Sequence, residues 1–594
     1  MEIVLHGIGV SPGIAIGPAL TFGVTALDVP KYSITNVKKE QRRFEEAVDE
    51  LRTEWQRLHE RTRETLGEQH AEIFKTQLMA LDDPTMREDI ARGIEEQKAN
   101  AEHLVQEWFG RHAKLLEASD VPLFRERAAD LVDVGRKLVS KLLKADLESL
   151  EKLEKPSVIV AHDLSPSDAA KLDVKNTLGI VTDASGPTSH TAILARAYEI
   201  PAVVGLRFVG SYALPGDMIV VDGTKGDVLI RPDTETLSRY RIRGEREARG
   251  RRALLAAEIK PSSTVDGVAI PTLANIELPI ELAHSKRVHA QGIGLYRTEY
   301  LYLNRSTLPT EEEQYEAYAE AAQAMAPWPV TLRTLDVGGD KLVSHLQLGD
   351  ETNPQLGWRA VRFCLERRDI FEAQLRAMFR ASVHGNVQIM FPLISGLEEL
   401  RRVKEIVREV CAHLERRGVP FKKSVPIGTM IEVPSAVAIS EHLAKECDFF
   451  SIGTNDLIQY SLAVDRGNER IAHMYEPAHP AVLRMIHHAI RSAKSARIPC
   501  AICGEMAGDP LFSEVLIGLG ISSLSMSAVS IPLVRAEISH IRYSLARRFA
   551  MRALKMGTAV DIREAMTRRS EQRKALDEYL QSLDLDEGGT VEAR

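Results

Sequence analysis

The sequence predicts a multidomain α/β protein: an α/β domain that carries an inserted helical domain, followed by a (β/α)8 TIM barrel. Three observations support this fold class. The chain has 594 residues, which is long for a single domain. Eight apolar strand-like segments alternate with helical patterns in its second half, and that many repeats over roughly 300 residues is typical of a TIM barrel. In the first half, a long stretch of helical periodicity separates two groups of short strands.

The first half of the chain is expected to form the α/β domain and its insert. Residues 1–20 alternate apolar and small residues, which is typical of short strands and turns. Residues 21–147 place apolar residues at helical spacing, as in EEAVDELRTEWQRLHERTRETL. Strand and helix patterns return over residues 148–232, in SVIVAH, GIVTD, AVVGL, MIVVDG and DVLIRP. Because the opening strands have no other obvious partner, we assign 1–20 and 148–232 to one domain.

A charged segment joins this domain to the barrel. Residues 233–260 have the composition of a helix, so we expect a linker helix with a hinge there. The barrel is expected over residues 261–575, and a frayed C-terminal tail over 576–594. The eight predicted barrel strands lie within residues 269–277, 292–300, 330–339, 387–395, 427–435, 447–456, 500–508 and 522–529.

Composition narrows the class of protein. Charged residues make up 27% of the chain and hydrophobic residues 44%, with a formal net charge of −8, which is ordinary for a soluble globular protein. A general nucleic-acid-binding protein would be more basic. The sequence has no apolar run of about 18 residues, and its start lacks the features of a signal peptide. We therefore expect a cytoplasmic protein.

The cysteines predict no disulfide framework. There are five, an odd number, and all lie in the second half of the chain. Cys500 and Cys503 form a C-x-x-C motif, but no second pair of cysteines or histidines lies at zinc-binding spacing. We expect free thiols, with zinc or redox use as the less favoured alternative.

Polar residues follow many of the predicted barrel strands, at the end of a TIM barrel where active sites lie. Several arginines at one mouth predict a small ligand with several negative charges, because guanidinium groups pair with phosphate and carboxylate oxygens. Glu432 and Asp456 would repel such a ligand, unless they hold a Mg²⁺ ion that its phosphate and carboxylate complete. Surface salt bridges are the alternative, favoured less for the whole set than for any one arginine. The residues concerned are Arg297, Glu299, Arg333, Asp336, Arg359, Arg362, Glu432, Asn455, Asp456, Arg466, Cys503 and Glu505.

One of the 18 histidines, His190, stands out by its position. It follows a Gly-Pro turn in GPTSHTAILAR, and the apolar spacing of a helix begins there. Amide groups at the helix start, with the hydroxyls of Thr188, Ser189 and Thr191, could satisfy phosphoryl oxygens on the imidazole. A neutral imidazole is a competent nucleophile near pH 7. The alternative is that His190 only caps the helix or packs in a core.

Several longer segments strengthen this interpretation. They are GIGVSPGIAIG, TSHTAILAR, GIGLYRTEYLY, DVGGDK, NPQLGWRAVR, MIEVPSA, SIGTNDLIQYSLAVDR and CGEMAGDP. Nearly from end to end, the sequence resembles Enzyme I of the bacterial phosphotransferase system, the phosphoenolpyruvate–protein phosphotransferase family.

The resemblance implies an enzyme that phosphorylates itself on His190 at the expense of phosphoenolpyruvate, releases pyruvate, and passes the phosphoryl group to the phosphocarrier protein HPr. This is the first step of sugar phosphotransfer. Family members are homodimers through the barrel, and their helical insert docks HPr. We expect the His190 domain to swivel about the linker between barrel and carrier. The implied roles are phosphate and carboxylate binding by Arg297, Arg333, Arg359 and Arg466, Mg²⁺ binding by Glu432 and Asp456, substrate contact by Asn455 and Asp456, and protonation of the enolate by Cys503.

Four positions depart from the family pattern. They are Gln77 in the insert, Ala169, and Ser185 and Pro187 in the turn before His190. These departures leave open which carrier protein, HPr or an HPr-like one, accepts the phosphoryl group, and which sugars or regulatory targets lie downstream.

Two other functions are alternatives that the sequence favours less. A pyruvate-phosphate dikinase-like enzyme would share the histidine domain and the barrel, but it needs an ATP-binding domain, and no glycine-rich phosphate loop precedes His190. A regulator that senses phosphoenolpyruvate without catalysis would not need the full set of arginine, acid, cysteine and histidine residues.

Overall fold

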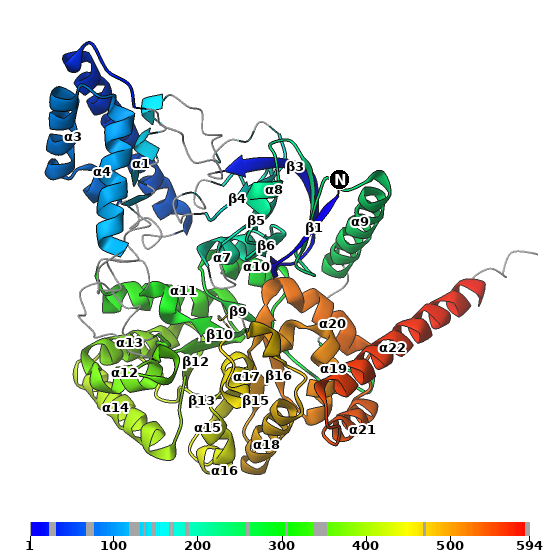
Figure 1. Cartoon of the computed structure of the whole chain (residues 1–594). Coiled ribbons are helices and arrows are strands. Elements are labelled where there is room, and N and C mark those ends of the chain that lie inside the picture. Colours follow the sequence, from blue (N-terminus) through cyan, green and yellow to red (C-terminus); the bar gives the residue numbers. More distant parts are fainter. Residues whose placement is uncertain are drawn as a thin grey trace, which may run out of the picture. The chain divides into compact units, whose positions relative to one another are not determined.

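The computed structural model describes most of the chain. It leaves undescribed residues 1, 23–30, 67–76, 118–130, 133, 136, 140, 144–149, 151–152, 154, 165–167, 169–171, 185–188, 257–261, 303–306, 338–352, 467, 469–470 and 588–594. For residues 61–66, 117, 190, 193, 197, 251–256, 280, 472 and 574–587 it describes the backbone alone. The described residues form two compact units, one with most of the chain up to Gly250 and one with most of the chain from Arg251 (Figure 1).

The helical part of the first unit has its own apolar core. Its long helices are α1 (Val37–Leu66), α3 (Pro84–Gln97) and α4 (Ala101–Glu117). Phe44 and Trp55 of α1 and Phe109 of α4 are buried in one cluster, so the apolar spacing read from the sequence faces inward. Helix α3 begins at Pro84, where Asp83 caps it by accepting a hydrogen bond from the Thr85 amide at 2.8 Å.

The rest of the first unit is built on an eight-stranded sheet in the order β1-β8-β7-β3-β4-β5-β6-β2. The opening strands pair with strands that follow the helical residues: β3 runs parallel to β4 and antiparallel to β7, and β2 pairs with β6. The short helices α7 (His190–Ala197) and α8 (Val209–Tyr212) also belong to this part. The strands are β1 (Ile3–His6), β2 (Ile8–Ser11), β3 (Ile14–Phe22), β4 (Ser157–Ala161), β5 (Thr177–Thr182), β6 (Ala202–Val204), β7 (Met218–Asp222) and β8 (Asp227–Ile230).

The predicted linker is a helix, α9 (Thr234–Ala256). Its middle is fastened to the sheet, because Arg243 Nη1 lies 2.7 Å from a carboxylate oxygen of Asp222, a fully buried residue at the end of β7. The division between the two units falls after Gly250. A hinge within residues 233–260 would therefore lie beyond Arg243.

The second unit is a closed barrel of eight parallel strands, which confirms the predicted fold class and all eight predicted strands. The barrel closes where Leu524 of the last strand pairs with Thr272 of the first. In order, the strands are β9 (Thr272–Ile276), β10 (Ile293–Arg297), β11 (Pro329–Arg333), β12 (Asn386–Phe391), β13 (Ile427–Ile431), β14 (Phe449–Ile452), β15 (Cys500–Ile502) and β16 (Ser523–Ser527).

Helices follow the strands around the outside of the barrel (Figure 1). They are α10 (Ile280–Arg287), α11 (Glu311–Met325), α12 (Ala360–Glu366), α13 (Arg368–Ala381), α14 (Leu397–Arg416), α15 (Pro434–Ala438), α16 (Ser440–Leu443), α17 (Thr454–Leu462), α18 (Pro480–Ala496), α19 (Pro510–Leu519), α20 (Ile531–Ser539), α21 (Tyr543–Ala553) and α22 (Ala559–Glu587). Helix α22 continues past residue 576, where the tail was predicted to begin, and Arg569 anchors it to the buried Glu514 at 2.9 Å.

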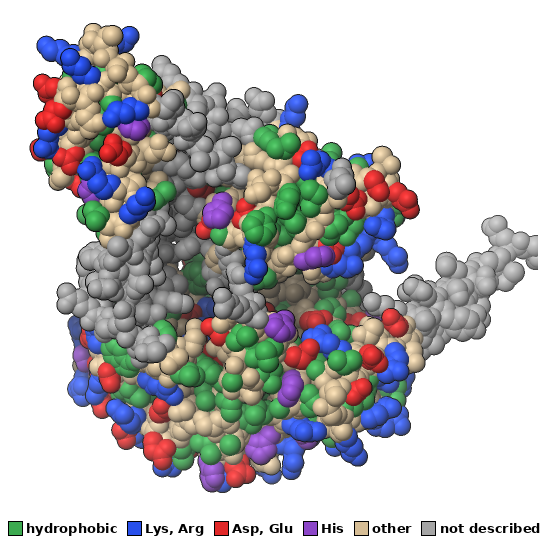
Figure 2. Space-filling model, in the orientation of Figure 1, with side chains coloured by type: hydrophobic (Ala, Val, Ile, Leu, Met, Phe, Trp, Pro, Cys, Tyr) green, Lys and Arg blue, Asp and Glu red, His purple; other side chains and the backbone are tan. Residues whose placement is uncertain are grey.

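The surface carries charged side chains of both signs, as the composition of the chain predicts. On the face of the barrel unit seen in Figure 2, Lys and Arg side chains are interspersed with Asp and Glu. All five cysteines are free thiols. In the described part of the chain, every helix lacks the combination of length and apolar character that crossing a membrane requires.

Candidate active site

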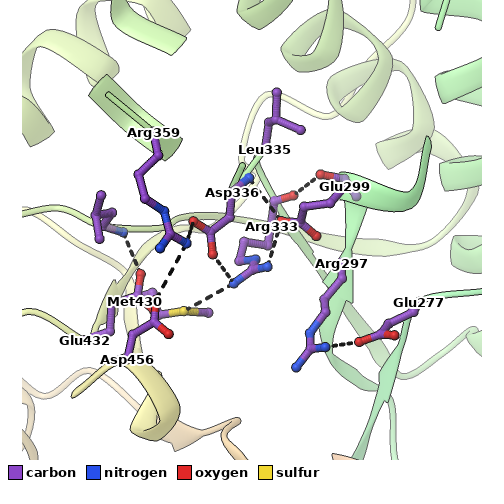
Figure 3. Close-up of polar contacts among 12 residues, drawn as sticks. Glu277, Arg297, Glu299, Arg333, Leu335, Asp336, Arg359, Met430, Glu432 and Asp456 are labelled. Atoms are coloured by element: carbon purple, nitrogen blue, oxygen red, sulfur yellow. Dashed lines mark hydrogen bonds and ion pairs between the residues drawn. The ribbon is translucent and has the colours of Figure 1, made fainter. Parts of the chain in front are cut away.

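The structure brings most of the predicted site residues together at the carboxyl ends of the barrel strands (Figure 3). Parallel strands all end at the same rim, so residues far apart in the sequence meet there. Arg297 and Arg333 are the last residues of β10 and β11, and Glu432 directly follows β13. Asp456 lies in the first turn of α17, after β14, and Cys503 directly follows β15.

Arg333 is the centre of a buried charge network. Its Nη2 donates to Glu299 Oε1 at 2.7 Å, and its Nη1 lies 2.7 Å from Asp336 Oδ2. The Asp336 amide donates to the same Glu299 oxygen at 3.0 Å. Burial alone would lower the pKa of the Arg333 guanidinium, but Glu299 and Asp336 outweigh it and the pKa is raised. Arg333 therefore stays cationic in the buried mouth.

Arg359 joins the same network from the segment before α12. Its Nη2 donates to Asp336 Oδ1 at 2.8 Å and lies 3.7 Å from Asp456 Oδ2. Burial raises the pKa of Asp336, but Arg359 and Arg333 beside it lower it overall, so its carboxylate stays ionised. We call Glu299, Arg333, Asp336, Arg359, Glu432 and Asp456 the mouth cluster.

Arg362, three residues further along the same motif, lies outside this cluster. Its Nη1 donates to the backbone carbonyl oxygens of Leu356 and Gly357 at 3.1 and 3.3 Å, and its Nε lies 3.7 Å from Glu399 Oε1. It therefore supports the segment that carries Arg359, and the expectation that both arginines face the ligand is wrong for Arg362.

Arg297 forms an ion pair with Glu277, the residue after β9 (Figure 3). Its charge still lowers the pKa of the Cys503 thiol, although burial outweighs that effect. The Arg297 guanidinium is therefore within electrostatic reach of Cys503, with Glu277 holding it in this structure.

Glu432 and Asp456 supply the two carboxylates expected to bind a metal ion. Both are buried, and the Leu393 amide donates to Glu432 Oε1 at 2.6 Å. Burial raises the pKa of Glu432 well above its ordinary value, and the negative charges of Asp456 and Asp336 raise it further. A cation between these carboxylates would remove their repulsion, and Mg²⁺ prefers oxygen ligands of this kind. The residues present fit such an ion.

These carboxylates would not hold an ion alone. Among the described residues, no three His, Cys, Asp or Glu side chains lie close enough together to form a complete metal site. Magnesium usually keeps several waters and takes oxygens from a bound phosphate. A site with two carboxylates beside several arginines therefore suits a metal ion whose remaining ligands come from an anionic substrate.

Arg466 and Asn455 lie nearer the rim. Arg466 Nη2 is 3.9 Å from Asp456 Oδ1, its Nη1 is 3.9 Å from Glu505 Oε1, and its side chain is 39% exposed. Asn455 donates from Nδ2 to Glu505 Oε1 at 3.1 Å and accepts from the Glu505 amide at 3.0 Å. The long contacts and exposure of Arg466 leave its side chain able to turn toward a ligand, whereas Asn455 is buried and held by Glu505.

Cys503, at the carboxyl end of β15, lies among apolar side chains, including Leu295, Met430 and Phe449. Its thiol is 3.6 Å from the Ile452 carbonyl oxygen. Burial, with a contribution from Glu432, raises the pKa of the Cys503 thiol to about 11. The shift makes the protonated, proton-donating form still more dominant at neutral pH than in an ordinary thiol.

Several buried polar atoms of the mouth have no hydrogen-bond partner among the described residues. They are Glu299 Oε2, Arg333 Nε, Arg359 Nε and Thr454 Oγ1. An unsatisfied buried polar group costs about 1–3 kcal/mol. Such a concentration at one place indicates a site completed by water or by a polar ligand.

Tyr460 is a functional candidate that the sequence analysis missed. It lies on α17, four residues after Asp456, and so on the same helix face. Its hydroxyl donates to the Gln355 carbonyl oxygen at 2.6 Å and accepts from Arg359 Nη1 at 3.5 Å. The residue thus connects the helix of Asp456 to the segment of Arg359, and the i, i+4 spacing was the signal that could have identified it.

His190 is the first residue of α7, as predicted. Ser189 caps this helix, because its hydroxyl accepts a hydrogen bond from the Ala192 amide at 3.2 Å. The Thr191 hydroxyl is buried and donates to the Leu164 carbonyl oxygen at 3.4 Å, so the prediction that it meets a phosphoryl group is wrong. Thr188, Ala169, Ser185 and Pro187 lie outside the described residues; Gln77 is buried.

Three family models match the chain in sequence order. Residues 6–127 match the N-terminal domain of the PEP-utilising enzymes, 153–226 their mobile domain, and 252–543 their PEP-binding domain. The last of these matches contains the whole mouth cluster, and the second contains His190.

Curated relatives match over nearly the whole length. The phosphoenolpyruvate-protein phosphotransferases of Bacillus sp. (strain S) and Geobacillus stearothermophilus are each 42% identical over 561 residues, covering 94% of this chain and 97% of theirs. That of Staphylococcus aureus (strain MRSA252) is 39% identical over 565 residues, covering 95% of this chain and 99% of its own.

Proposed function

The chain belongs to the phosphoenolpyruvate–protein phosphotransferase family, and on that premise we propose that it transfers the phosphoryl group of phosphoenolpyruvate to His190, releases pyruvate, and passes the group on to a histidine phosphocarrier protein. The observation that carries the proposal is the mouth cluster: cationic arginines and two metal-type carboxylates, with Arg333 and Glu432 within electrostatic reach of a protonated thiol. An anion that carries a phosphate group, a carboxylate group and a carbon that accepts a proton fits this arrangement.

Substrate binding is assigned to the arginines. Arg333 and Arg359 hold fixed positive charge in a buried place, where it interacts more strongly with phosphate and carboxylate than it would in water. Arg297, Arg466 and Asn455 complete the binding set from the rim. Phosphoryl transfer passes through a loose transition state that needs positioning and charge neutralisation more than covalent assistance.

Glu432 and Asp456 would hold a divalent cation, Mg²⁺ in the family's pattern. When bound, this ion neutralises and orients the oxygens of the substrate. The buried pair is suited to it because, without a cation, burial and the charge of Asp456 raise the pKa of Glu432.

In the reaction, the imidazole of His190 attacks phosphorus in line with the leaving enol oxygen, through Nε2. The phosphorus–oxygen bond breaks, and the enolate that leaves collapses to the ketone of pyruvate. Its methylene carbon takes the proton of the Cys503 thiol, which the apolar surroundings keep protonated. The thiolate then regains a proton from solvent, and His190 keeps the phosphoryl group.

The second transfer is assigned to a carrier protein. HPr or an HPr-like protein would dock on the helical residues of the first unit, and α7 would move between barrel and carrier by rotation about α9 beyond Arg243. We further propose that the enzyme acts in the cytoplasm as a homodimer through the barrel. Which sugars or regulatory targets receive the phosphoryl group depends on the carrier.

The proposal is tested by incubating the full chain with Mg²⁺ and phosphoenolpyruvate labelled on phosphorus. We expect one acid-labile, base-stable label per chain at His190, with stoichiometric pyruvate, and loss of the label when a carrier is added. Labelling by ATP instead, or phosphoenolpyruvate binding without any label, would overturn it.

Metal binding is expected to depend on pH. Because the pKa of Glu432 is raised by burial and by neighbouring carboxylates, the free protein binds a proton there that Mg²⁺ must displace. Mg²⁺ affinity should therefore fall as pH is lowered, by up to about tenfold per pH unit. Titration calorimetry of the full chain at pH 6 and 8, about one unit on either side of neutrality, measures the change in Mg²⁺ affinity.

The matched control for that titration is Glu432→Gln. The variant cannot bind the displaced proton, so it should bind Mg²⁺ weakly and with a shallower pH dependence. An affinity that is equal at both pH values in the unaltered chain would contradict the assignment of Glu432.

A further inference from the structure

A fully buried glutamine contacts two of the strand ends that carry the mouth cluster. Gln374 lies on α13 and is 0% exposed. Its Oε1 accepts a hydrogen bond from the Leu335 amide at 3.0 Å. Its Nε2 donates to the Thr298 hydroxyl at 3.1 Å. A buried amide that accepts on one side and donates on the other is fixed in one orientation, since the reverse orientation would leave both groups unsatisfied.

Each contact of Gln374 lies next to a charged residue of the site. Thr298 is between Arg297 and Glu299, and its hydroxyl donates to the Arg333 carbonyl oxygen at 2.8 Å. Leu335 directly precedes Asp336. The amide of Gln374 thus ties the end of β10 to the end of β11 through hydrogen bonds to the backbone and to one hydroxyl.

This tie controls the geometry of the charge network. Glu299 comes from the β10 end, whereas Arg333 and Asp336 come from the β11 end, and Glu299 Oε1 accepts from both at 2.7 and 3.0 Å. A small separation of the two ends would break these contacts and tilt the Arg333 guanidinium. Misplacement by about 1 Å away from the chemistry can reduce a rate by roughly 10²-fold.

We propose that Gln374 is a positioning residue for phosphoenolpyruvate: it sets the register of the β10 and β11 ends, and thereby places Arg333 and Asp336 for the substrate. Gln374 is buried and acts through Thr298 and Leu335. This inference rests on the proposed function and deepens it at the same site.

The first test compares Gln374→Met with Tyr318→Phe in the full chain. Methionine keeps the size and removes both contacts to the strand ends. Tyr318→Phe removes the third hydrogen bond of Gln374, at 3.4 Å, and the bond from the Tyr318 hydroxyl to Gln314 Oε1 at 3.3 Å, but it leaves both contacts of Gln374 to the strand ends in place. We expect both variants to lose thermal stability, but only Gln374→Met to lose kcat/KM for phosphoenolpyruvate, by roughly 10- to 100-fold.

The second test measures how kcat/KM of Gln374→Glu depends on pH. It also tests the positioning role if Gln374→Met does not fold. A protonated carboxyl can accept from the Leu335 amide and donate to Thr298, whereas a carboxylate cannot donate. Burial raises a carboxyl pKa. The variant should therefore approach wild-type kcat/KM at low pH and lose it as pH rises, with no matching loss in the wild type.

The outcomes separate the two proposals. A wild type that binds phosphoenolpyruvate but does not label His190 overturns the proposed function, and calorimetric binding still tests Gln374. Equal losses of phosphoenolpyruvate affinity or kcat/KM in Gln374→Met and Tyr318→Phe, or a pH-independent Gln374→Glu, overturn the positioning role.

Discussion

An alanine variant at His190 is expected to accept no phosphoryl group from phosphoenolpyruvate and to pass none to a carrier. The imidazole is the proposed nucleophile, and removing a covalent nucleophile abolishes the reaction that runs through it. We expect a loss of at least about 10⁴-fold in phosphoryl relay. The measurement is transfer of label from phosphoenolpyruvate to carrier, with titration calorimetry showing that Mg²⁺ and phosphoenolpyruvate still bind the barrel.

His162→Ala is the matched control. His162 follows β4 in the same part of the first unit, its side chain is 70% exposed, and its Nδ1 lies 3.9 Å from Asp183 Oδ2. Its removal should leave labelling unchanged. A His190→Ala chain that still relays phosphate, or equal losses of labelling in the two variants, would contradict the assignment of His190 as the phosphorylated residue.

Replacing Cys503 with serine should give the second large effect. A serine hydroxyl is a much weaker acid than a thiol, and loss of a positioned general acid typically costs about 10²- to 10⁴-fold in rate. Pyruvate formation should fall by that amount while phosphoenolpyruvate affinity changes little. With phosphoenolpyruvate that carries tritium at one defined position of C3, protonation of that carbon in deuterium oxide should also lose its preference for one face, because solvent reaches both faces of a released enol.

Cys500→Ser is the control for this variant. Cys500 is also a buried thiol, three residues earlier at the start of β15, and it takes no part in the proposed chemistry. Its rate and facial preference should match the wild type. Facial selectivity retained in Cys503→Ser would assign the proton to another donor.

The wild-type pH profile follows from the same thiol. The group acts in its protonated form, and its pKa is raised to about 11, so the active form persists throughout the neutral and mildly alkaline range. Loss of this proton should lower the rate only as pH approaches 11. An alkaline decline near pH 8 to 9, about the range of an ordinary thiol, that disappears in Cys503→Ser would contradict the burial argument.

Local sequence identified the ends of the barrel strands but not the direction of every side chain there. Arg359 and Arg362 both lie in the motif NPQLGWRAVR, yet only Arg359 contacts Asp336. The helix that begins at Ala360 turns Arg362 toward the carbonyl oxygens of Leu356 and Gly357. The prediction that Thr191 meets a phosphoryl group is wrong for a similar reason. One residue into α7, its hydroxyl faces the buried side of the helix.

The class of fold, the eight barrel strands and the residue types at their ends could all be predicted from the sequence. Apolar periodicity is a property of neighbouring residues, and parallel strands necessarily end at one rim. The folded chain alone reveals which charges pair, that Glu432 and Cys503 have raised pKa values, and that Gln374 joins two strand ends. Those properties depend on burial and on distances between residues far apart in the chain, such as Thr298 and Gln374, and no local pattern records such distances.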